Sequence, residues 1–192
     1  VASKEEILPY LDRLHEELDI PVFYVSHSPD EVARLADQLV LMDRGRVLAT
    51  GSVAELLTRV DLPLAHRSDA ESIIEAKVVD HDATYDLTVV EFPGGRLRVA
   101  GLELEQGSGI RLRILARDVS LTLDRQTRTS ILNILPARIL ELSEEGTVQV
   151  MVKLDVGGVS LLARVTRRSA HALALEVGSE VFAQVKSVAV LL

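Results

Sequence analysis

The chain has 192 residues, of which 47% are hydrophobic, and carries a formal net charge of −8 at pH 7. That length suffices for one large domain or two small ones with a substantial core. The acidic balance argues against general nucleic-acid binding, which depends on an excess of Lys and Arg. Cysteine is absent, which excludes disulfides and thiolate metal sites, and no apolar run reaches the roughly 18 residues that cross a bilayer. We expect a soluble cytoplasmic protein without a nucleic-acid partner.

The first 60 residues alternate between helical and strand patterns. Residues 3–18 form a helical stripe, and Val22–Val25 a continuous apolar run. A helix start follows at Ser28–Glu31, then a hairpin at 39–49 and a second helix start at Ser52–Leu57. The continuous apolar run is typical of a strand buried on both faces of a parallel sheet, and Pro9 predicts a kink in the first helix. Because roughly 60 residues cannot cover both faces of a sheet, we expect an incomplete α/β domain.

Motifs in this stretch resemble the switch-histidine segment of ABC-transporter ATPases, which have the P-loop NTPase fold. The resemblance is carried by Tyr24-Val25-Ser26-His27-Ser28-Pro29-Asp30-Glu31-Val32, Leu35-Ala36-Asp37, Met42-Asp43-Arg44-Gly45-Arg46-Val47 and Gly51. It implies that His27 contacts the γ-phosphate of ATP in a complete ATPase. A histidine at the C-terminal edge of a buried strand is compatible with ligand contact. Taken without the surrounding motifs, His27 would instead be read as a loop histidine bonded to the backbone, since single-residue motifs often mislead.

The phosphate-binding parts of such an ATPase are absent from the sequence. No glycine is followed by lysine, so there is no GxxxxGK[ST] loop, and the family's Ser-Gly-Gly signature and magnesium-binding carboxylates are missing as well. We therefore expect residues 1–60 to be the C-terminal fragment of an ABC ATPase domain. The resemblance implies ATP and Mg only in the full-length parent, and this fragment should be inactive as an ATPase.

The chain then changes to strand patterns that occur twice. Residues 61–72 lose apolar periodicity and predict a linker or crossing segment. Period-two patterns predict strands at 76–79, 85–90, 96–99 and 110–115, and again at 137–140, 148–152, 160–165 and 181–190. Gly94-Gly95 matches Gly157-Gly158, and Gly107-Ser108 matches Gly178-Ser179, which indicates an internal duplication.

The second copy carries eight more residues between its paired glycines and its Gly-Ser. The surplus, at residues 166–175, predicts a short helix that ends before Gly178. Short strands with a helix at one end outline a small oligonucleotide-binding (OB) type barrel. We expect an all-β regulatory domain of two tandem OB-like barrels, at residues 73–125 and 126–192.

Four segments resemble the molybdate-binding Mop domain, or molbindin, a TOBE-type regulatory module. They are Ala116-Arg117-Asp118-Val119-Ser120-Leu121, Ser130-Ile131-Leu132-Asn133-Ile134-Leu135-Pro136, Val165-Thr166-Arg167-Arg168-Ser169-Ala170 and Ala183-Gln184-Val185-Lys186-Ser187-Val188. With the ATPase-like start, the whole chain resembles the ATP-binding subunits of molybdate ABC importers. That resemblance implies a homodimer that works with a membrane permease, peripheral on the cytoplasmic face of the inner membrane.

The same resemblance implies the site residues. The family binds molybdate or tungstate at subunit contacts, with the Ser-x-x-Asn segment of one chain and the Thr and Lys-Ser of another. Carried onto this sequence, the oxyanion-binding residues are Ser130, Leu132, Asn133, Thr166, Lys186 and Ser187, with Leu132 and Asn133 contributing backbone amides. Molbindins often have Arg where Leu132 stands, so one charged donor is missing and we expect weaker binding or a site devoted to sensing.

The chemistry of these residue types fits that role. Molybdate is a tetrahedral dianion whose oxygens only accept hydrogen bonds, and hydroxyls, backbone N–H groups and an ammonium satisfy it without covalent chemistry. From spacing alone, Ser130 capping a turn and Lys186 as an edge-strand charge is an equal alternative. Arg167 and Arg168 start the predicted helix and face either an acidic neighbour or the anion. The four histidines besides His27 lack partners at metal-ligand spacing, and no metal site is expected.

Three functions remain in view at this point. The first is feedback regulation, in which bound oxyanion disfavours closure of the ATPase domains. The second is a purely structural dimerisation module of another importer ATPase, for sulfate, iron or sugars. The third is a stand-alone oxyanion-storage protein, which the ATPase-like residues 1–60 disfavour.

Overall fold

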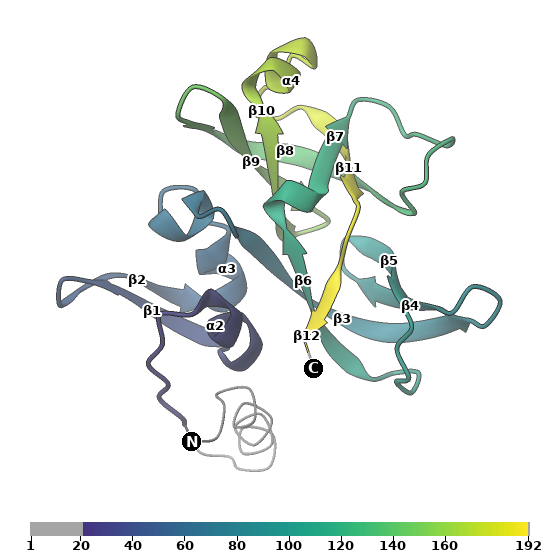
Figure 1. The fold of residues 1–192 in the computed structure, drawn as a ribbon, viewed down its shortest axis with the longest axis horizontal. Helices are drawn as coiled ribbons and strands as arrows, with labels where there is room; N and C mark the ends of the chain where they lie inside the picture. Colours follow the sequence, from purple (N-terminus) through teal and green to yellow (C-terminus); the bar gives the residue numbers. More distant parts are fainter. Residues whose placement is uncertain (1–20, 192) are drawn as a thin grey trace. The chain divides into compact units, whose positions relative to one another are not determined.

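The computed structural model describes residues 21–191, which fall into two compact units, one ending at Val53 and one beginning at Ala54 (Figure 1). The helix predicted over residues 3–18, with its kink at Pro9, lies outside the described range. Within that range, no helix is long and apolar enough to span a membrane.

The first unit contains a short helix and a hairpin. Helix α2 (Pro29–Leu35) begins with proline in its first turn, and strands β1 (Gln38–Asp43) and β2 (Arg46–Ser52) pair antiparallel, as predicted. The buried strand predicted at Val22–Val25 is wrong. These residues have no regular structure, and Val25 is 98% exposed. A strand needs a neighbour for its backbone hydrogen bonds, and in the described residues β1 and β2 pair only with each other.

The second unit is built from two five-stranded antiparallel sheets, preceded by helix α3 (Val53–Leu57). The strands are β3 (Glu71–Asp82), β4 (Leu87–Phe92), β5 (Gly95–Ala100), β6 (Gly109–Leu115), β7 (Val119–Thr122), β8 (Asn133–Glu145), β9 (Gln149–Val156), β10 (Val159–Thr166), β11 (Glu180–Val185) and β12 (Ala189–Leu191). The short helix α4 (Arg167–Ala172) follows β10, as predicted.

The two sheets exchange their last strands. One sheet has the order β5-β4-β3-β6-β12 and the other β10-β9-β8-β11-β7. Thus β7 leaves the first set of strands to pair with β11, and β12 returns from the second set to pair with β6. The two barrels were expected to meet between residues 125 and 126. Each sheet instead contains one strand from the other side of that boundary. Periodicity identifies a strand but not the sheet it joins, because pairing depends on contacts distant in sequence.

The register of both sheets supports the predicted duplication but corrects one of its glycine matches. The turn between Phe92 and Gly95 is Pro93-Gly94 and the turn between Val156 and Val159 is Gly157-Gly158, so Gly94 corresponds to Gly158 and not to Gly157. Each long strand has a bulge at the same place, between Val78 and Asp80 in β3 and between Ile139 and Glu141 in β8. Val78 exchanges backbone hydrogen bonds with residues 107 and 108, and Ile139 does so with residues 178 and 179, all at 2.8–2.9 Å. We call residues 71–122 the first repeat and residues 133–191 the second.

The glycine turns of the two repeats lie against each other. A Cβ atom on Gly157 would come within 2.7 Å of the Gly94 Cα atom and the Pro93 carbonyl oxygen, and one on Gly94 would come within 2.4 Å of the Val156 carbonyl oxygen. Since this is backbone rather than flexible side chain, the contact depends on glycine at both positions. The repeats therefore meet at their turns as well as through the exchanged strands.

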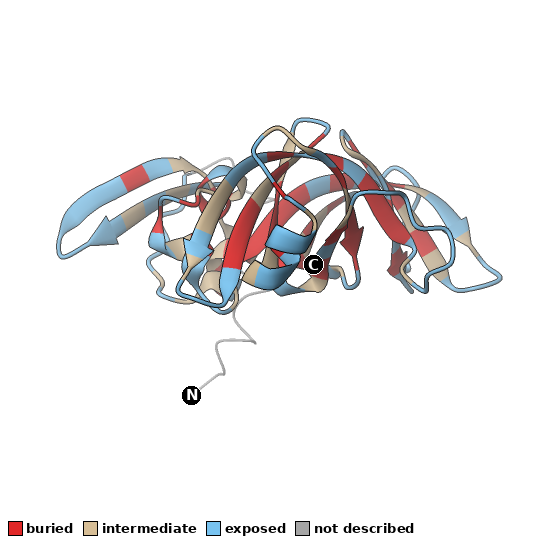
Figure 2. Cartoon of the chain, turned by 90° about the horizontal axis from the view of Figure 1, so that it is seen from above, coloured by how far each residue is buried: buried red, intermediate tan, exposed pale blue. Residues whose placement is uncertain are grey.

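A continuous core joins the repeats, with buried residues concentrated along the strands (Figure 2). A second, smaller apolar cluster contains Val60, Ala65, Ala70, Ala116, Met151 and Leu162. It lies beneath the segment expected as a linker, which includes the 3-10 turn η1 (Pro63–His66). Arg164 donates to the carbonyl oxygens of Arg67 and Ser68, at 2.5 and 3.2 Å. The segment is thus packed against the second repeat and is a crossing segment, not a free linker.

Candidate oxyanion-binding site

Asn133 stands at the first position of β8 and is buried. Its side-chain oxygen accepts from the backbone N–H of Arg98 at 2.7 Å, and its side-chain nitrogen donates to the Arg98 carbonyl at 2.9 Å. Ser72 makes the corresponding bond in the first repeat, where its hydroxyl accepts from the backbone N–H of Leu162 at 2.9 Å. Each repeat thus holds an edge strand of the other. The Asn133 side chain is therefore used to hold the backbone of Arg98 and is not free to bind a ligand.

Lys186 and Ser187 lie at the same end of the sheet as Asn133. Asn133 is paired with Val185, and the backbone N–H of Lys186 donates to the Asp118 carbonyl at 2.9 Å. Lys186 directly follows Val185 and Leu132 directly precedes Asn133, so both residues adjoin the last pair of this ladder. Both Lys186 and Ser187 are exposed. An ammonium and a hydroxyl therefore stand beside the segment that precedes β8.

That preceding segment is an exposed loop, residues 123–132. The hydroxyl of Thr129 accepts from the backbone N–H of Ile131 at 3.1 Å, so the turn is capped by Thr129. Ser130 is exposed, and Leu132 is 57% exposed. The alternative role expected for Ser130 was to cap a turn, and in the described contacts Thr129 makes the capping bond.

Thr166 lies at the other end of β8. It is opposite Gln149, which pairs with Glu145, whereas Asn133 is at the start of this 13-residue strand. Thr166 is the N-cap of α4: its oxygen accepts from the backbone N–H of Ser169 at 3.1 Å. One chain thus brings Ser130, Asn133 and Lys186-Ser187 to one end of a sheet and leaves Thr166 at the opposite end.

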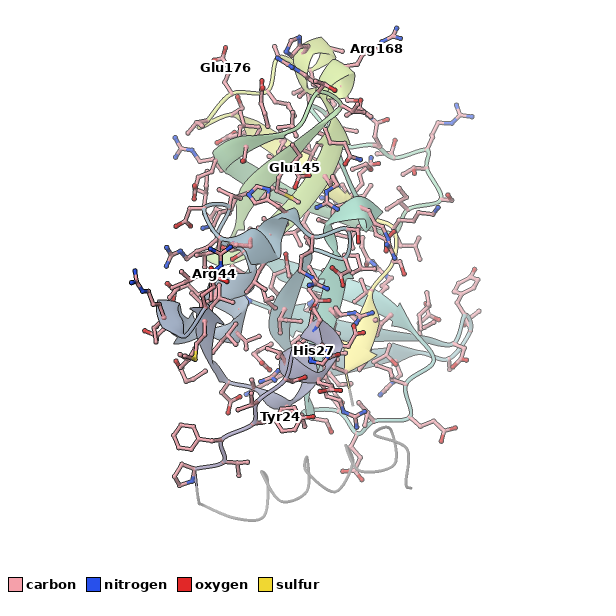
Figure 3. The ribbon with its side chains drawn as sticks, turned by 60° about the vertical axis from the view of Figure 1, so that its left-hand side comes forward. Tyr24, His27, Arg44, Glu145, Arg168 and Glu176 are labelled. Carbon is pink, nitrogen blue, oxygen red and sulfur yellow. The ribbon has the colours of Figure 1, made fainter. Side chains whose placement is uncertain are left out.

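The arginines that start α4 also differ from one another. Arg167 pairs with Glu144 at 3.1 Å, so it faces an acidic neighbour, the first of its two alternatives. Arg168 is exposed and points away from the ribbon (Figure 3). Neither lies at the end of the sheet that carries Lys186.

The equivalent place in the first repeat has the opposite charge. The bulges align Ser130 with Asp69 and Leu132 with Glu71. Glu71 is buried, with a carboxylate oxygen 3.5 Å from the Nε atom of Arg113. The Nε atom of Arg67 donates to Asp69 at 2.9 Å, and this bond holds the pKa of the Asp69 carboxyl below its ordinary value. In the first repeat these two positions thus hold carboxylates beside arginines, where the second repeat has the exposed Ser130 hydroxyl and the exposed Leu132.

A polar groove of about 850 Å³ adjoins the crossing segment. Glu145 lies between its two basic neighbours there, 2.7 Å from the Nε atom of Arg164 and 3.0 Å from the Nδ1 atom of His66. His66 also contacts the Val60 carbonyl oxygen at 2.7 Å. These groups satisfy one another and hold the crossing segment in place. In the described residues, no group of three acidic or histidine side chains is arranged to hold a metal ion.

His27 belongs to the first unit, where it is exposed at the bend before α2 (Figure 3). The side chains of Tyr24 and Ser26 both donate to the Glu31 carboxylate, the former at 2.8 Å. Ser28 makes no side-chain cap bond, although the sequence pattern predicts one; its backbone N–H donates to the Ser26 hydroxyl at 3.0 Å.

Sequence reasoning missed Arg98. Its backbone is held by Asn133, and its side chain is exposed. The glycine match in the sequence aligns Arg98 with Leu161, and only the strand register of the folded chain sets Arg98 against Leu162, a buried residue. A charged residue at a position that is apolar in the other copy marks a local change of role.

Comparison with known proteins defines first a class of domain. Residues 129–192 match the family model described as the TOBE domain. The fold of the chain resembles that of a solved structure titled as the cytoplasmic molybdate-binding protein ModG with molybdate bound. The TM-score is 0.56 at 23% identity, covering 62% of this chain and 94% of the other.

The particular relatives are named "Molybdenum import ATP-binding protein ModC". The chain is 54% identical to the one from Aromatoleum aromaticum over 191 residues, 57% identical to that from Albidiferax ferrireducens over 188, and 56% identical to that from Pseudomonas aeruginosa over 191. These matches cover 98–100% of the chain but only 51–53% of each relative. The chain is thus homologous to these import proteins and spans about half their length.

Proposed function

We propose that this chain is the oxyanion-sensing regulatory part of the ATP-binding subunit of a molybdate ABC importer. The observation that carries the proposal is identity above 50% across essentially the whole chain to proteins named for molybdenum import. The likeness of the fold to a molybdate-binding protein supports the assignment of sensing to the second unit. The names of these relatives favour molybdate over the sulfate, iron or sugar alternatives.

The second repeat supplies donors of the required kind for molybdate or tungstate. Ser130 and Ser187 offer hydroxyls, and Lys186 an ammonium, while backbone N–H groups at Leu132 and Asn133 are the remaining donors. All are hydrogen-bond donors with no nucleophile or general base among them, which suits holding an oxyanion and not transforming it.

We propose that a homodimer completes the site. Lys186 and the segment before Asn133 share one end of β8, so these groups come from the same chain, and Thr166 comes from a second copy. This division differs from the family pattern, in which Lys-Ser and Thr act from one chain. It follows from the length of β8, which separates Thr166 from Lys186 within a chain.

In the whole protein, residues 1–60 would end an ABC ATPase domain with the P-loop fold, and two OB-like barrels would follow. His27 would contact the γ-phosphate of ATP, with Mg supplied in that complete domain. The subunit would lie on the cytoplasmic face of the inner membrane through its permease. Bound oxyanion would stabilise one arrangement of the dimer and disfavour closure of the ATPase domains. It can do so only through different affinities for the two arrangements.

Calorimetric titration of the chain with molybdate and tungstate tests the binding, with sulfate as the control. We expect molybdate and tungstate to give saturable binding heats, with saturation reached at micromolar concentrations of the free oxyanion. No heat from either, far above that range, contradicts the sensing function and favours a purely structural dimerisation module.

Mixed dimers test the division of the site. Copies carrying Lys186→Ala and copies carrying Thr166→Ala should each bind molybdate poorly. Random re-association of an equal mixture makes about half of the dimers mixed, and each mixed dimer has one of its two sites with both groups intact. Binding should therefore return to about a quarter of the normal stoichiometry. If mixing restores nothing, the two residues do not act across a dimer.

A further inference from the structure

Arg98 and Leu162 occupy the same position in the two repeats. Within each repeat, β4 pairs with β5 as β9 pairs with β10, with Val90 opposite Leu97 and Leu154 opposite Leu161. The next residue along is Arg98 in β5 and Leu162 in β10. Each has its backbone held from the other sheet, by Asn133 and by Ser72 respectively. The backbone settings therefore correspond, and the side chains differ.

Leu162 shows where a side chain at this position is directed. It is fully buried and belongs to the small apolar cluster with Ala70 and Ala116. Ala70 precedes β3, and Ala116 comes just after β6. The Leu162 side chain thus lies between the start of one strand and the end of another, beneath the crossing segment.

In the second repeat, the residues that correspond to Ala70 and Ala116 belong to the candidate site. The register aligns Ala70 with Ile131, and the end of β6 with the Lys186-Ser187 junction after β11. The position of Arg98 thus corresponds to one whose side chain packs against the equivalents of Ile131 and of the Lys186-Ser187 junction. Here the preceding residues, 123–130, form an exposed loop and do not bury this place.

Two cations thus replace apolar neighbours at this end of the second sheet. Arg98 and Lys186 are both exposed, and neither forms an ion pair with another described residue. The nearest arginine on the same face of β5, Arg96, is already held by Glu91, with 2.9 Å between Nε and Oε1. Two unneutralised like charges repel each other, and an anion held between them removes that cost.

We propose that Arg98 is the second cation of the oxyanion site, reaching it from the first repeat. A planar guanidinium presents paired N–H donors to two oxygens of a tetrahedral dianion, while Lys186 contributes a point charge. Asn133 positions Arg98 by holding its backbone. The inference rests on the proposed function and adds a residue to its site.

Titration of the whole 192-residue chain with molybdate tests the role of Arg98. Arg98→Leu installs the side chain that the second repeat carries at this position, where it is Leu162, so the variant should fold with an unchanged or higher melting temperature. Its molybdate affinity should fall about tenfold or more, the usual effect of losing a charged hydrogen bond. Arg98→Lys keeps the positive charge but loses the paired N–H donors of the guanidinium, so its molybdate affinity should lie between those of Arg98→Leu and the parent chain.

The matched control is Arg96→Leu, two residues along the same face of the same strand, which should bind within about twofold of the parent chain. Adding Leu132→Arg to Arg98→Leu should recover affinity by returning a guanidinium to the site. Unchanged affinity in Arg98→Leu, with molybdate bound normally by the parent chain, overturns this inference alone. Failure of the parent chain itself to bind molybdate overturns the proposed function with it.

Discussion

The two repeats share one backbone plan but place different chemistry at the start of their first strand. In the first repeat this place is a packed junction, with Leu162 buried and the carboxylates of Asp69 and Glu71 held by neighbouring arginines. In the second it is open and carries Arg98 and Lys186. The same bulges and strand pairings hold both, so the difference lies in side chains and in the segment that precedes each repeat.

This difference shows how one duplicated fold supports two roles. The crossing segment covers the first junction and packs apolar residues beneath it, which stabilises the unit. The loop at 123–132 leaves the second junction exposed, where polar donors remain available to a ligand. A covered junction is structural, and an uncovered one becomes a candidate site.

The largest effect should come from the place where the repeats meet. Gly157→Ala adds a methyl group against the backbone of Gly94, and we expect a loss of about 3 kcal/mol in unfolding free energy. Gly146→Ala is the control, because its φ of 61° nearly equals the 60° of Gly157 but no atom lies within 4 Å of the added Cβ. It should cost only about 1 kcal/mol, the penalty of the left-handed conformation. Urea denaturation measures both, and equal losses would refute the contact between turns.

The next effect separates the charged junction from the rest of the surface. Lys186→Ala should weaken molybdate binding about thirtyfold, equivalent to about 2 kcal/mol for a charge-assisted hydrogen bond. Lys77→Ala, an exposed lysine of β3 in the first repeat, should leave the affinity unchanged. Calorimetry of the two variants makes the comparison. Equal affinities for both would show that Lys186 is an ordinary edge-strand charge.

The side-chain clamps provide a test of the equivalence between the repeats. Ser72→Ala leaves the buried N–H of Leu162 without its acceptor and should cost about 1.5 kcal/mol of unfolding free energy. Asn133→Ala should cost at least as much, because it removes two bonds to Arg98. Ser120→Ala, whose hydroxyl lies 3.4 Å from Gln184, is the control and should be nearly neutral. A clamp variant as stable as the control would mean that this edge strand needs no bond from the other sheet.

The smallest effect concerns pH and the acidic first junction. Because Arg67 holds the pKa of Asp69 below its ordinary value, the pair adds stability above about pH 4, which is lost as pH falls through the lowered pKa. The carboxylate is partly exposed, so the contribution should be only a few tenths of a kcal/mol. Arg67→Gln should remove this part of the acid sensitivity in thermal melts between pH 2 and pH 6. An identical pH profile for the variant would exclude the pair as its source.

Much of the second unit could be predicted from local pattern. Period-two stretches marked its strands, Gly107-Ser108 and Gly178-Ser179 marked the duplication, and residues 166–175 marked α4. These succeeded because alternation and turn residues act within a few positions of the chain. The prediction of a buried strand at Val22–Val25 was wrong. An apolar run favours burial, but a strand also needs a neighbouring strand to pair with, and the run itself does not provide one.

For the candidate site, the sequence alone determined the chemical types, since Ser130, Lys186 and Ser187 bring hydroxyls and an ammonium wherever the fold sets them. Only the tertiary structure decided their grouping. It set Lys186 beside the segment that enters β8, moved Thr166 to the far end of that strand, and brought Arg98 in from the other repeat. Strand exchange and inter-sheet hydrogen bonds join residues tens of positions apart, and no local pattern records which partner a strand will take.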